Sequence, residues 1–253
     1  MSFQQIFIVG APRSGTTFAA SLLESSSYGV PVESHFISKY YQKLDSFGDL
    51  NNLENFSGLV RAILSERPVM QWDIEPDIEA LHASLEKPVT YAGLVNRLCA
   101  MRADRIGTTA WGDKTPRYVE HIDSLATLFP RARFIWMVRD GRDVAMSLLD
   151  RSWGPNNLYA CATYWRDLNE AGAKAMANID DGRLLKIRYE DLLEEPQPVL
   201  STILDFLDEP YDKTMLQDLT RETRQGNKLK WKTALSASEI ELFESVAKEQ
   251  LHA

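Results

Sequence analysis

A short apolar run that leads into a glycine-bracketed polar turn constrains this chain more than any other feature. Residues 6–9 are apolar, Gly10 and Gly15 bracket the turn, and a helical pattern begins at Thr16. A strand, a glycine-rich turn and a helix N-terminus together present backbone N–H groups to an anion. The glycine spacing matches the nucleotide-binding signature G-x-x-x-x-G-K-[ST], but Thr16 occupies the lysine position. The turn therefore predicts a phosphate-binding loop that lacks the lysine which contacts the β- and γ-phosphates of ATP.

Three apolar segments predict strands. They are residues 5–9, "ARFIWMV" at 132–138 and "RLLKIRY" at 183–189. Short apolar runs of this kind are typical of strands buried on both faces of a parallel sheet. Ligands of such sheets bind beyond the carboxyl ends of the strands. The loops after residues 9 and 138 are therefore expected at the same functional edge.

Helical patterns follow each predicted strand. The first spans 16–25, the second begins at a capping Asp140 and runs to about Arg151, and the third has Pro196 near its first turn. Ser236 and Glu239, a capping-box pair, precede a last amphipathic helix. This alternation predicts an α/β fold, a three-layer sandwich with a mainly parallel central sheet.

Residues 36–110 differ from the rest of the chain because they contain few strand signals. We interpret them as a helical insertion after the first strand–helix unit, on the acceptor side of the site. A chain of 253 residues is long enough for one large α/β domain, and we predict that 1–253 form a single domain.

Composition excludes several classes of protein. The net charge of −8 argues against broad nucleic-acid binding, although a local basic pocket is compatible with it. Two cysteines, Cys99 and Cys161, make neither a disulfide framework nor a metal-ligand pattern. No window has the length of a membrane span, and the N-terminus does not resemble a signal peptide. We expect a soluble, cytoplasmic protein.

The first loop carries donors suited to an anion. Arg13 offers a fixed cationic fork, and Ser14, Thr16 and Thr17 offer hydroxyl groups. Without a lysine in the loop, and with Arg139 rather than an acidic magnesium ligand at the end of 132–138, transfer of the ATP γ-phosphoryl group is disfavoured.

Arg139 is the second indication of an anion-binding site. It follows the strand at 132–138, and Ser147 lies two turns along the next helix, so the two side chains can clamp a second phosphate. The alternative is a local salt bridge between Arg139 and Asp140, which contributes little at a surface.

The two motifs together carry a resemblance. "APRSGTT" followed by "FIWMVRDGRDVAMSL" resembles the paired signatures of sulfotransferases that use 3′-phosphoadenosine 5′-phosphosulfate (PAPS), and the second motif is most similar to tyrosylprotein sulfotransferases and their bacterial relatives. The resemblance implies that the first loop binds the 5′-phosphosulfate. Its expected donor-site residues there are Pro12, Arg13, Ser14, Gly15, Thr16 and Thr17. It further implies that Arg139 and Ser147 bind the 3′-phosphate, and that no metal is needed.

Three further segments extend the resemblance. "WGDKTPRY" implies that Lys114 assists the leaving group, "KIRYEDLLEEP" that Tyr189 lies near the adenine, and "GNKLKWK" that Lys228 and Lys230 lie near the 3′ end of the nucleotide. The alternative for Lys114 is a surface lysine in a turn, and the alternative for Tyr189 is a core tyrosine. For Lys228 and Lys230 it is a solvated basic face.

Sulfuryl transfer to a hydroxyl group needs a general base. "GVPVESHF" at 29–36 offers Glu33 and His35, which share a face if the segment is extended. Glu33 occupies a position similar to the catalytic glutamate segment of tyrosylprotein sulfotransferases. His35 has an ordinary pKa suited to neutral pH. Glu33 is the favoured base and His35 the alternative.

We therefore expect an enzyme that moves a sulfuryl group from PAPS to a hydroxyl or amine acceptor and releases 3′-phosphoadenosine 5′-phosphate (PAP). The rival hypotheses are a P-loop small-molecule kinase and a non-catalytic nucleotide-binding relative. Small molecules, carbohydrates and peptidyl tyrosine all remain open as acceptors. Tyr40, Tyr41 and Trp72 either line an aromatic site or fill a core.

Overall fold

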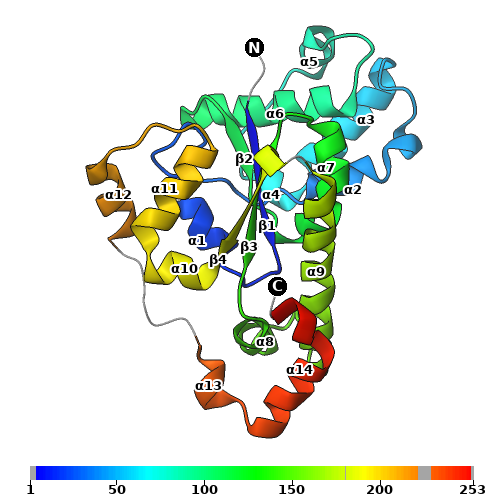
Figure 1. Cartoon of the computed structure of the whole chain (residues 1–253). Coiled ribbons are helices and arrows are strands. Elements are labelled where there is room, and N and C mark those ends of the chain that lie inside the picture. The colour runs from blue at the N-terminus through cyan, green and yellow to red at the C-terminus, as the bar shows by residue number, and fades with distance from the viewer. Residues whose placement is uncertain (1–3, 180, 222–228, 252–253) are drawn as a thin grey trace.

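A parallel sheet of four strands forms the centre of the molecule, in the order β2-β1-β3-β4 (Figure 1). The computed structural model describes residues 4–179, 181–221 and 229–251. The strands span Gln5–Gly10 (β1), Trp111–Asp113 (β2), Arg133–Val138 (β3) and Leu184–Arg188 (β4). The predicted parallel sheet is confirmed.

Strand β1 is the hub of the sheet because it pairs with both β2 and β3. Phe7 lies opposite Asp113 on one side, and Gly10 lies opposite Met137 on the other. Strand β4 then pairs with β3, with Val138 opposite Arg188. All these pairings are parallel, so the carboxyl ends of the strands meet at one edge.

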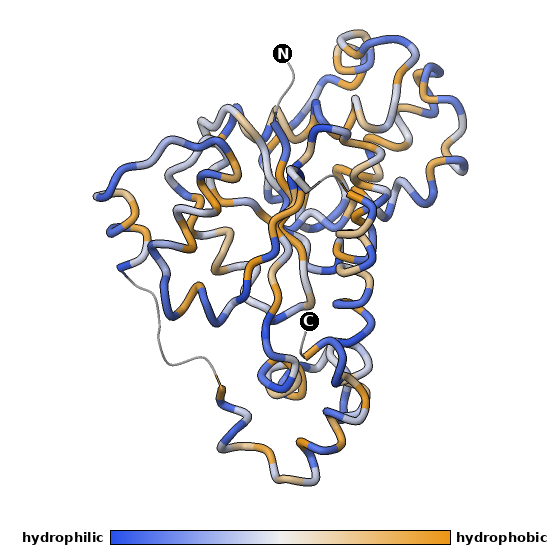
Figure 2. The backbone as a smooth tube through the Cα atoms, viewed as in Figure 1, coloured by the Kyte–Doolittle hydropathy of each residue, from blue (hydrophilic) through white to orange (hydrophobic). Residues whose placement is uncertain are grey.

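Side chains that alternate along β1 supply two separate cores. Phe7 and Val9 join the larger core on one face of the sheet, and Ile6 and Ile8 join the smaller core on the other. Figure 2 shows the strands as a hydrophobic centre between helices of mixed polarity. Burial on both faces explains why these strands are apolar throughout and do not alternate with polar residues.

Helices cover both faces of the sheet, so the three-layer prediction is confirmed (Figure 1). On the side of the smaller core lie α1 (Thr16–Ser21), α10 (Tyr189–Glu194), α11 (Pro196–Phe206) and α12 (Lys213–Thr220). On the other side lie α7 (Ile122–Leu128) and α9 (Leu158–Asn178), while α8 (Gly141–Leu149), α13 (Trp231–Ala234) and α14 (Ala237–Leu251) lie towards the carboxyl edge. Two of the 3-10 helices span Pro116–His121 (η2) and Asp181–Arg183 (η3).

The segment 36–110 is helical, as predicted. It contains α2 (Phe36–Tyr41), η1 (Leu44–Phe47), α3 (Leu53–Leu64), α4 (Arg67–Met70), α5 (Ile78–Ser84) and α6 (Tyr91–Ile106). Tyr40 and Trp72 are buried in the larger core and Tyr41 packs against it, which favours the core interpretation of these aromatic residues.

The structure differs from the sequence prediction at two elements. Strand β2 was not predicted, because it has three residues and Gly112 at its centre. A Cβ at Gly112 would lie 2.8 Å from both Ile6 and Pro31, so the strand fits there only without a side chain. Helix α1 ends at Ser21, and the predicted stretch to residue 25 continues as turns.

The predicted helix caps are present. The Asp140 carboxylate accepts a hydrogen bond from the Arg142 backbone N–H at 2.9 Å. Ser236 and Glu239 exchange the reciprocal bonds of a capping box ahead of α14. Among the described residues, no helix is both long enough and apolar enough to cross a membrane.

Candidate active site

The loop between β1 and α1 has a backbone that requires glycine at two positions. Gly10 has φ 149° and Gly15 has φ 90°, and Arg13 between them has φ 74°. A Cβ on Gly10 would lie 2.3 Å from the Met137 carbonyl oxygen, and one on Gly15 would lie 2.2 Å from the Tyr189 ring. The glycines therefore allow the loop to pass close to β3 and to Tyr189 while it presents Arg13 to the solvent side.

A cavity of about 1370 Å³ opens at the carboxyl edge of the sheet, over this loop. Most residues predicted for the site line it: Pro12, Arg13, Gly15, Thr16, Thr17, Glu33, His35, Arg139, Ser147, Tyr189 and Lys230. The structure therefore brings together side chains from the two ends of the chain and from three strand ends.

Two predicted residues, Ser14 and Lys114, are not part of the cavity wall, and a third cannot be placed. Ser14 is fully buried and is not part of the cavity wall. Lys114 is also buried, with 7% of its surface exposed, and contacts the cavity through Thr17 and Glu33. Lys228 lies outside the described residues.

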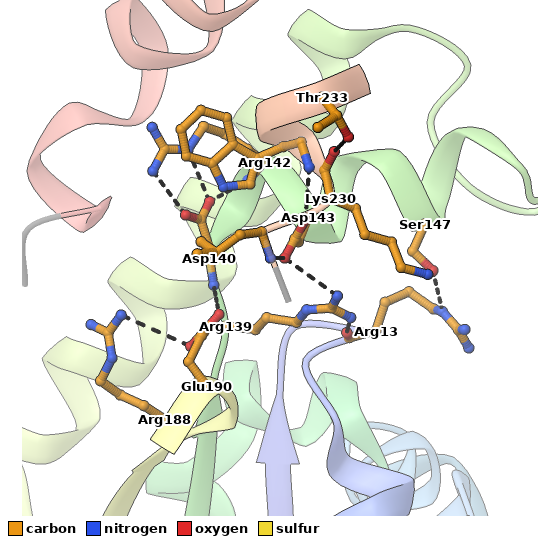
Figure 3. Close-up of polar contacts among 12 residues, drawn as sticks. Arg13, Arg139, Asp140, Arg142, Asp143, Ser147, Arg188, Glu190, Lys230 and Thr233 are labelled. Carbon is orange, nitrogen blue, oxygen red and sulfur yellow. Dashed lines mark hydrogen bonds and ion pairs between the residues drawn. The ribbon is translucent and has the colours of Figure 1, made fainter. Parts of the chain in front are cut away.

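The two arginines share one side of the cavity. The Arg13 Nε donates to the Ser147 hydroxyl at 2.8 Å, and Arg139 Nη1 donates to the Arg13 carbonyl at 3.1 Å (Figure 3). Burial lowers the pKa of Arg13, and the neighbouring Arg151 and Arg139 lower it further. A concentration of positive charge of this kind favours an anionic ligand. One molecule with two phosphate groups can therefore contact both arginines.

Arg139 is held by contacts on several sides. Its guanidinium lies 4.6 Å from the Tyr189 ring centre and 3.6 Å from the Asp143 carboxylate. The Trp165 indole donates to its carbonyl oxygen at 3.1 Å. The alternative salt bridge to Asp140 is not formed, since that carboxylate pairs with Arg142 at 2.8 Å.

Lys114 connects the phosphate loop with the candidate base. It follows β2, and its Nζ donates to the Thr17 hydroxyl at 3.1 Å and to the Glu33 carboxylate. The other Glu33 oxygen lies 3.0 Å from the His35 ring. Glu33 and His35 therefore do share a face, as the extended segment predicted.

These contacts perturb the pKa values of the pair. The hydrogen bond to His35 and the contact with Lys114 lower the pKa of Glu33 to about 2, against the opposing effect of burial. The same hydrogen bond raises the pKa of His35. Glu33 is therefore an ionised carboxylate at neutral pH.

The segment that carries Glu33 and His35 is fixed to β2. Val32 forms an isolated parallel bridge with Asp113, and the Thr115 hydroxyl accepts the Ser34 backbone N–H at 3.2 Å. His35 adopts φ 59°, an uncommon conformation for a residue other than glycine, and its N–H also points to the Thr115 hydroxyl. Backbone contacts to β2 thus set where the imidazole lies.

Part of the cavity wall was not predicted from the sequence. Pro116, Arg117, Met146, Trp153 and Tyr164 also line it. They come from η2, α8, the turn after α8 and α9, and carry no local motif. None of the residues that line the cavity belongs to 36–110, so the acceptor-side role of that insertion remains a prediction.

Comparisons with known proteins identify the family of this chain. A sequence model described as the sulfotransferase family matches residues 5–213. Protein-tyrosine sulfotransferase 1 of Danio rerio is 27% identical over 217 residues, 83% of this chain and 55% of its own length. Protein-tyrosine sulfotransferase of Drosophila melanogaster is 26% identical over 221 residues, 83% of this chain and 39% of its own. The chain spans about half the length or less of these relatives.

Solved structures resemble the fold. The sulfotransferase domain of the Synechococcus PCC 7002 olefin synthase superposes with a TM-score of 0.62 at 21% identity, covering 96% of this chain and 94% of that one. A mouse sulfotransferase complexed with PAP superposes with a TM-score of 0.54 at 14% identity, covering 97% and 85%. The segment that the family model matches contains the loop at Arg13 and the pair Arg139 and Ser147, which line the cavity, and it also contains the buried Lys114. With four-fifths of its length matched to the family, this chain is a member of the sulfotransferase family.

Proposed function

We propose that this protein transfers a sulfuryl group from PAPS to a hydroxyl acceptor. The observation that carries the proposal is the position of Lys114, whose ammonium contacts both Thr17 of the phosphate loop and Glu33, the candidate base. A cation between an anion site and a carboxylate can stabilise charge on a leaving phosphate while the carboxylate takes a proton.

The donor is bound at two sites in the cavity, one at Arg13 and one at Arg139. The backbone amides of residues 12–17, with Arg13 and the hydroxyls of Thr16 and Thr17, hold the 5′-phosphosulfate. Arg139, Ser147 and Lys230 hold the 3′-phosphate, and the Tyr189 ring lies near the adenine. The contact of Arg139 with the Arg13 backbone supports a single ligand across both sites, because the two groups lie in one cavity.

In the transfer step, the acceptor oxygen forms a bond to sulfur as the bond from sulfur to the bridging phosphate oxygen breaks. Negative charge develops on that bridging oxygen, and Lys114 neutralises it from its position beside Thr17. The acceptor proton passes to Glu33, and PAP leaves. Positioning and charge neutralisation carry the catalysis, as they do in phosphoryl transfer.

Glu33 is the proposed base, with His35 as its partner. In the resting contact its pKa of about 2 makes it a weak base. When Lys114 turns to the donor, Glu33 loses one of the contacts that stabilise its charged form, and its pKa rises towards the ordinary value. The hydrogen bond from His35 then keeps the carboxylate in position.

The proposed acceptor is a phenolic hydroxyl such as that of tyrosine. Tyr164, Trp153, Met146 and Pro116 line the cavity and offer an apolar and aromatic wall suited to a planar ring. The curated relatives named above carry the name of protein-tyrosine sulfotransferases, which supports the same class of acceptor.

The test is sulfate transfer from radiolabelled PAPS to a panel of simple phenols, sugars and tyrosine peptides. We expect label on the phenols or peptides, and loss of transfer in Arg139→Ala. Turnover of Mg-ATP without any dependence on PAPS would favour the small-molecule kinase. Binding of PAP with no transfer to any acceptor class would favour a non-catalytic relative.

A further inference from the structure

Asp143 is a buried carboxylate in the first turn of α8, and none of its side chain is exposed. Its two oxygens accept hydrogen bonds from backbone N–H groups of a distant segment, Leu229 at 2.7 Å and Trp231 at 3.1 Å. A buried charge is costly unless it is paired and hydrogen-bonded. Asp143 lines the cavity, but both of its carboxylate oxygens accept hydrogen bonds within the protein.

The partner charge of Asp143 is Arg139, the arginine proposed for the 3′-phosphate. The Arg139 guanidinium lies 3.6 Å from Asp143 Oδ2 and also donates to the Arg13 carbonyl. Figure 3 shows Asp143 above Arg139, with Arg13 on the other side. Asp143 thus limits the orientations open to the guanidinium that reaches the phosphate loop.

The segment held by Asp143 forms part of the cavity wall. Lys230 and Thr233 line the cavity, and Figure 3 shows the Lys230 side chain extending towards Ser147. A second contact holds the same segment, because the Arg142 guanidinium lies 3.6 Å from the Trp231 ring centre. Arg142 is in turn fixed by Asp140 and Glu244.

We propose that Asp143 is a positioning residue for the 3′ side of the donor site. It orients Arg139 and holds the backbone of 229–231, so that Lys230 and Arg139 approach the same phosphate. The inference rests on the proposed function, since it concerns the PAPS site. A carboxylate suits this task because it offers an acceptor to each N–H, whereas an amide offers one acceptor and one donor.

The direction in which PAP affinity changes when Asp143 is replaced distinguishes a positioning role from a purely electrostatic effect of its charge. Asp143 is negative and lies beside a site for an anion, so loss of its charge alone would strengthen phosphate binding. Loss of an anchor for Lys230 and Arg139 would weaken binding instead. An Asp143→Asn variant therefore distinguishes the two by the direction of the change.

The experiment is calorimetric titration of wild type and Asp143→Asn with PAP and with AMP, which lacks the 3′-phosphate. We expect the variant to lose about tenfold or more in PAP affinity, because one backbone N–H faces an amide N–H and the segment is released. AMP affinity should change by less than about twofold, since AMP does not use this side of the site. An equal loss for both nucleotides, or tighter PAP binding, would overturn the inference.

Two further variants complete the design. Asp150→Asn removes a negative charge that lines the same cavity, at the opposite end of α8 and without a described bond to 229–231, and should leave the ratio of PAP to AMP affinity unchanged. Trp231→Ala loosens the same segment without altering a buried charge, and should selectively weaken PAP even if Asp143→Asn folds poorly. Unchanged PAP affinity in Trp231→Ala would contradict the inference.

The same titrations separate this inference from the proposed function. Failure of the wild type to bind PAP would overturn both. Tight PAP binding by the wild type, with no selective loss in the variants, would overturn the positioning role alone.

Discussion

The Lys114 ammonium lies 3.1 Å from the Thr17 hydroxyl, although 97 positions separate the two residues in the chain. Strands β1 and β2 are neighbours in the sheet; Lys114 directly follows β2, and Thr17 lies in the first turn of α1, after the loop that follows β1. The contact therefore links the phosphate loop to the segment that carries the candidate base.

Replacement of Lys114 by alanine is expected to lower kcat by about 10²- to 10³-fold, the usual cost of removing one group that stabilises transition-state charge. PAP affinity should fall much less, because the proposed site assigns the phosphates to Arg13 and Arg139. The measurement is steady-state transfer from PAPS together with PAP titration. Lys174→Ala, on the exposed side of α9, is the matched control and should behave as wild type. A Lys114→Ala enzyme with normal kcat would contradict the role.

Glu33→Gln should lower kcat by about 10²- to 10⁴-fold, the range of general-base catalysis. His35→Gln should cost about tenfold, since His35 acts through Glu33. The pH profile of kcat/KM reports the free enzyme, in which the pKa of Glu33 is about 2 and that of His35 lies above its ordinary value. We therefore expect no rise in kcat/KM between pH 6.5 and 8, and a rise there would make His35 the base.

The same pair makes a pH-dependent contribution to folding. The pKa of Glu33 is lowered from 4.5 to about 2, so its stabilising contribution is complete above pH 4.5 and is lost as pH falls towards 2. The raised pKa of His35 means that its contribution is complete below 6.5 and is lost as pH rises through the folded-state value. The midpoints of thermal unfolding of His35→Gln and of wild type should therefore converge at pH values above the folded-state pKa of His35.

Asp113 should oppose folding as it ionises. Burial raises its pKa from 3.8 to about 6, with hydrogen bonds from Ser34 and Thr115 acting in the other direction. The unfolded chain loses this proton near pH 3.8 and the folded chain near pH 6, so stability falls across that interval and is level above it. Asp113→Asn should therefore gain stability relative to wild type between pH 4 and 7, by up to about 3 kcal/mol.

The measurement for Asp113 is the midpoint of thermal unfolding at several pH values in that interval. Asp104→Asn, an exposed aspartate in α6, is the control and should show no such dependence. A constant difference between Asp113→Asn and wild type across the interval would contradict the prediction.

Gly15→Ala should damage the donor site more than its backbone strain alone would. Both Gly15 (φ 90°) and Gly107 (φ 77°) have positive φ, but a Cβ at Gly107 meets no atom within 4 Å, while one at Gly15 meets the Tyr189 ring. Alanine at Gly107 therefore costs about 1 kcal/mol of strain and should leave PAP affinity unchanged. Alanine at Gly15 must displace the loop or Tyr189, and should abolish measurable PAP binding. Equal effects of the two changes would contradict this account.

Local patterns predicted much of the fold. The apolar strands at β1, β3 and β4, the caps at Asp140 and Ser236, and the helical insertion all follow from residues close together in the chain. Strand β2 did not, because three residues around Gly112 carry no periodic signal, and their burial depends on Ile6 and Pro31. The early end of α1 is likewise not marked by a proline or a capping glycine.

The candidate site likewise contains residues that local sequence patterns predicted and residues that they did not. Motif order placed Arg13 and Arg139 at one edge, and alternation placed Glu33 beside His35. The partner of Ser147 was not predicted, since Arg13 and not Arg139 bonds to it here. Asp143 was also missed, because its role depends on backbone groups 86 and 88 positions away. Contacts of that range have no signature in a single segment.

The central position of β1 has a geometric consequence. Lys114 follows β2 and Arg139 follows β3, the two strands that flank β1. Neighbouring strands lie about 4.8 Å apart, so the backbones that carry these two cations emerge about 10 Å from each other. If Lys114 and Arg139 contact the donor as proposed, the spacing of the strands fixes the distance that a ligand must span between its reactive oxygen and its far anionic group.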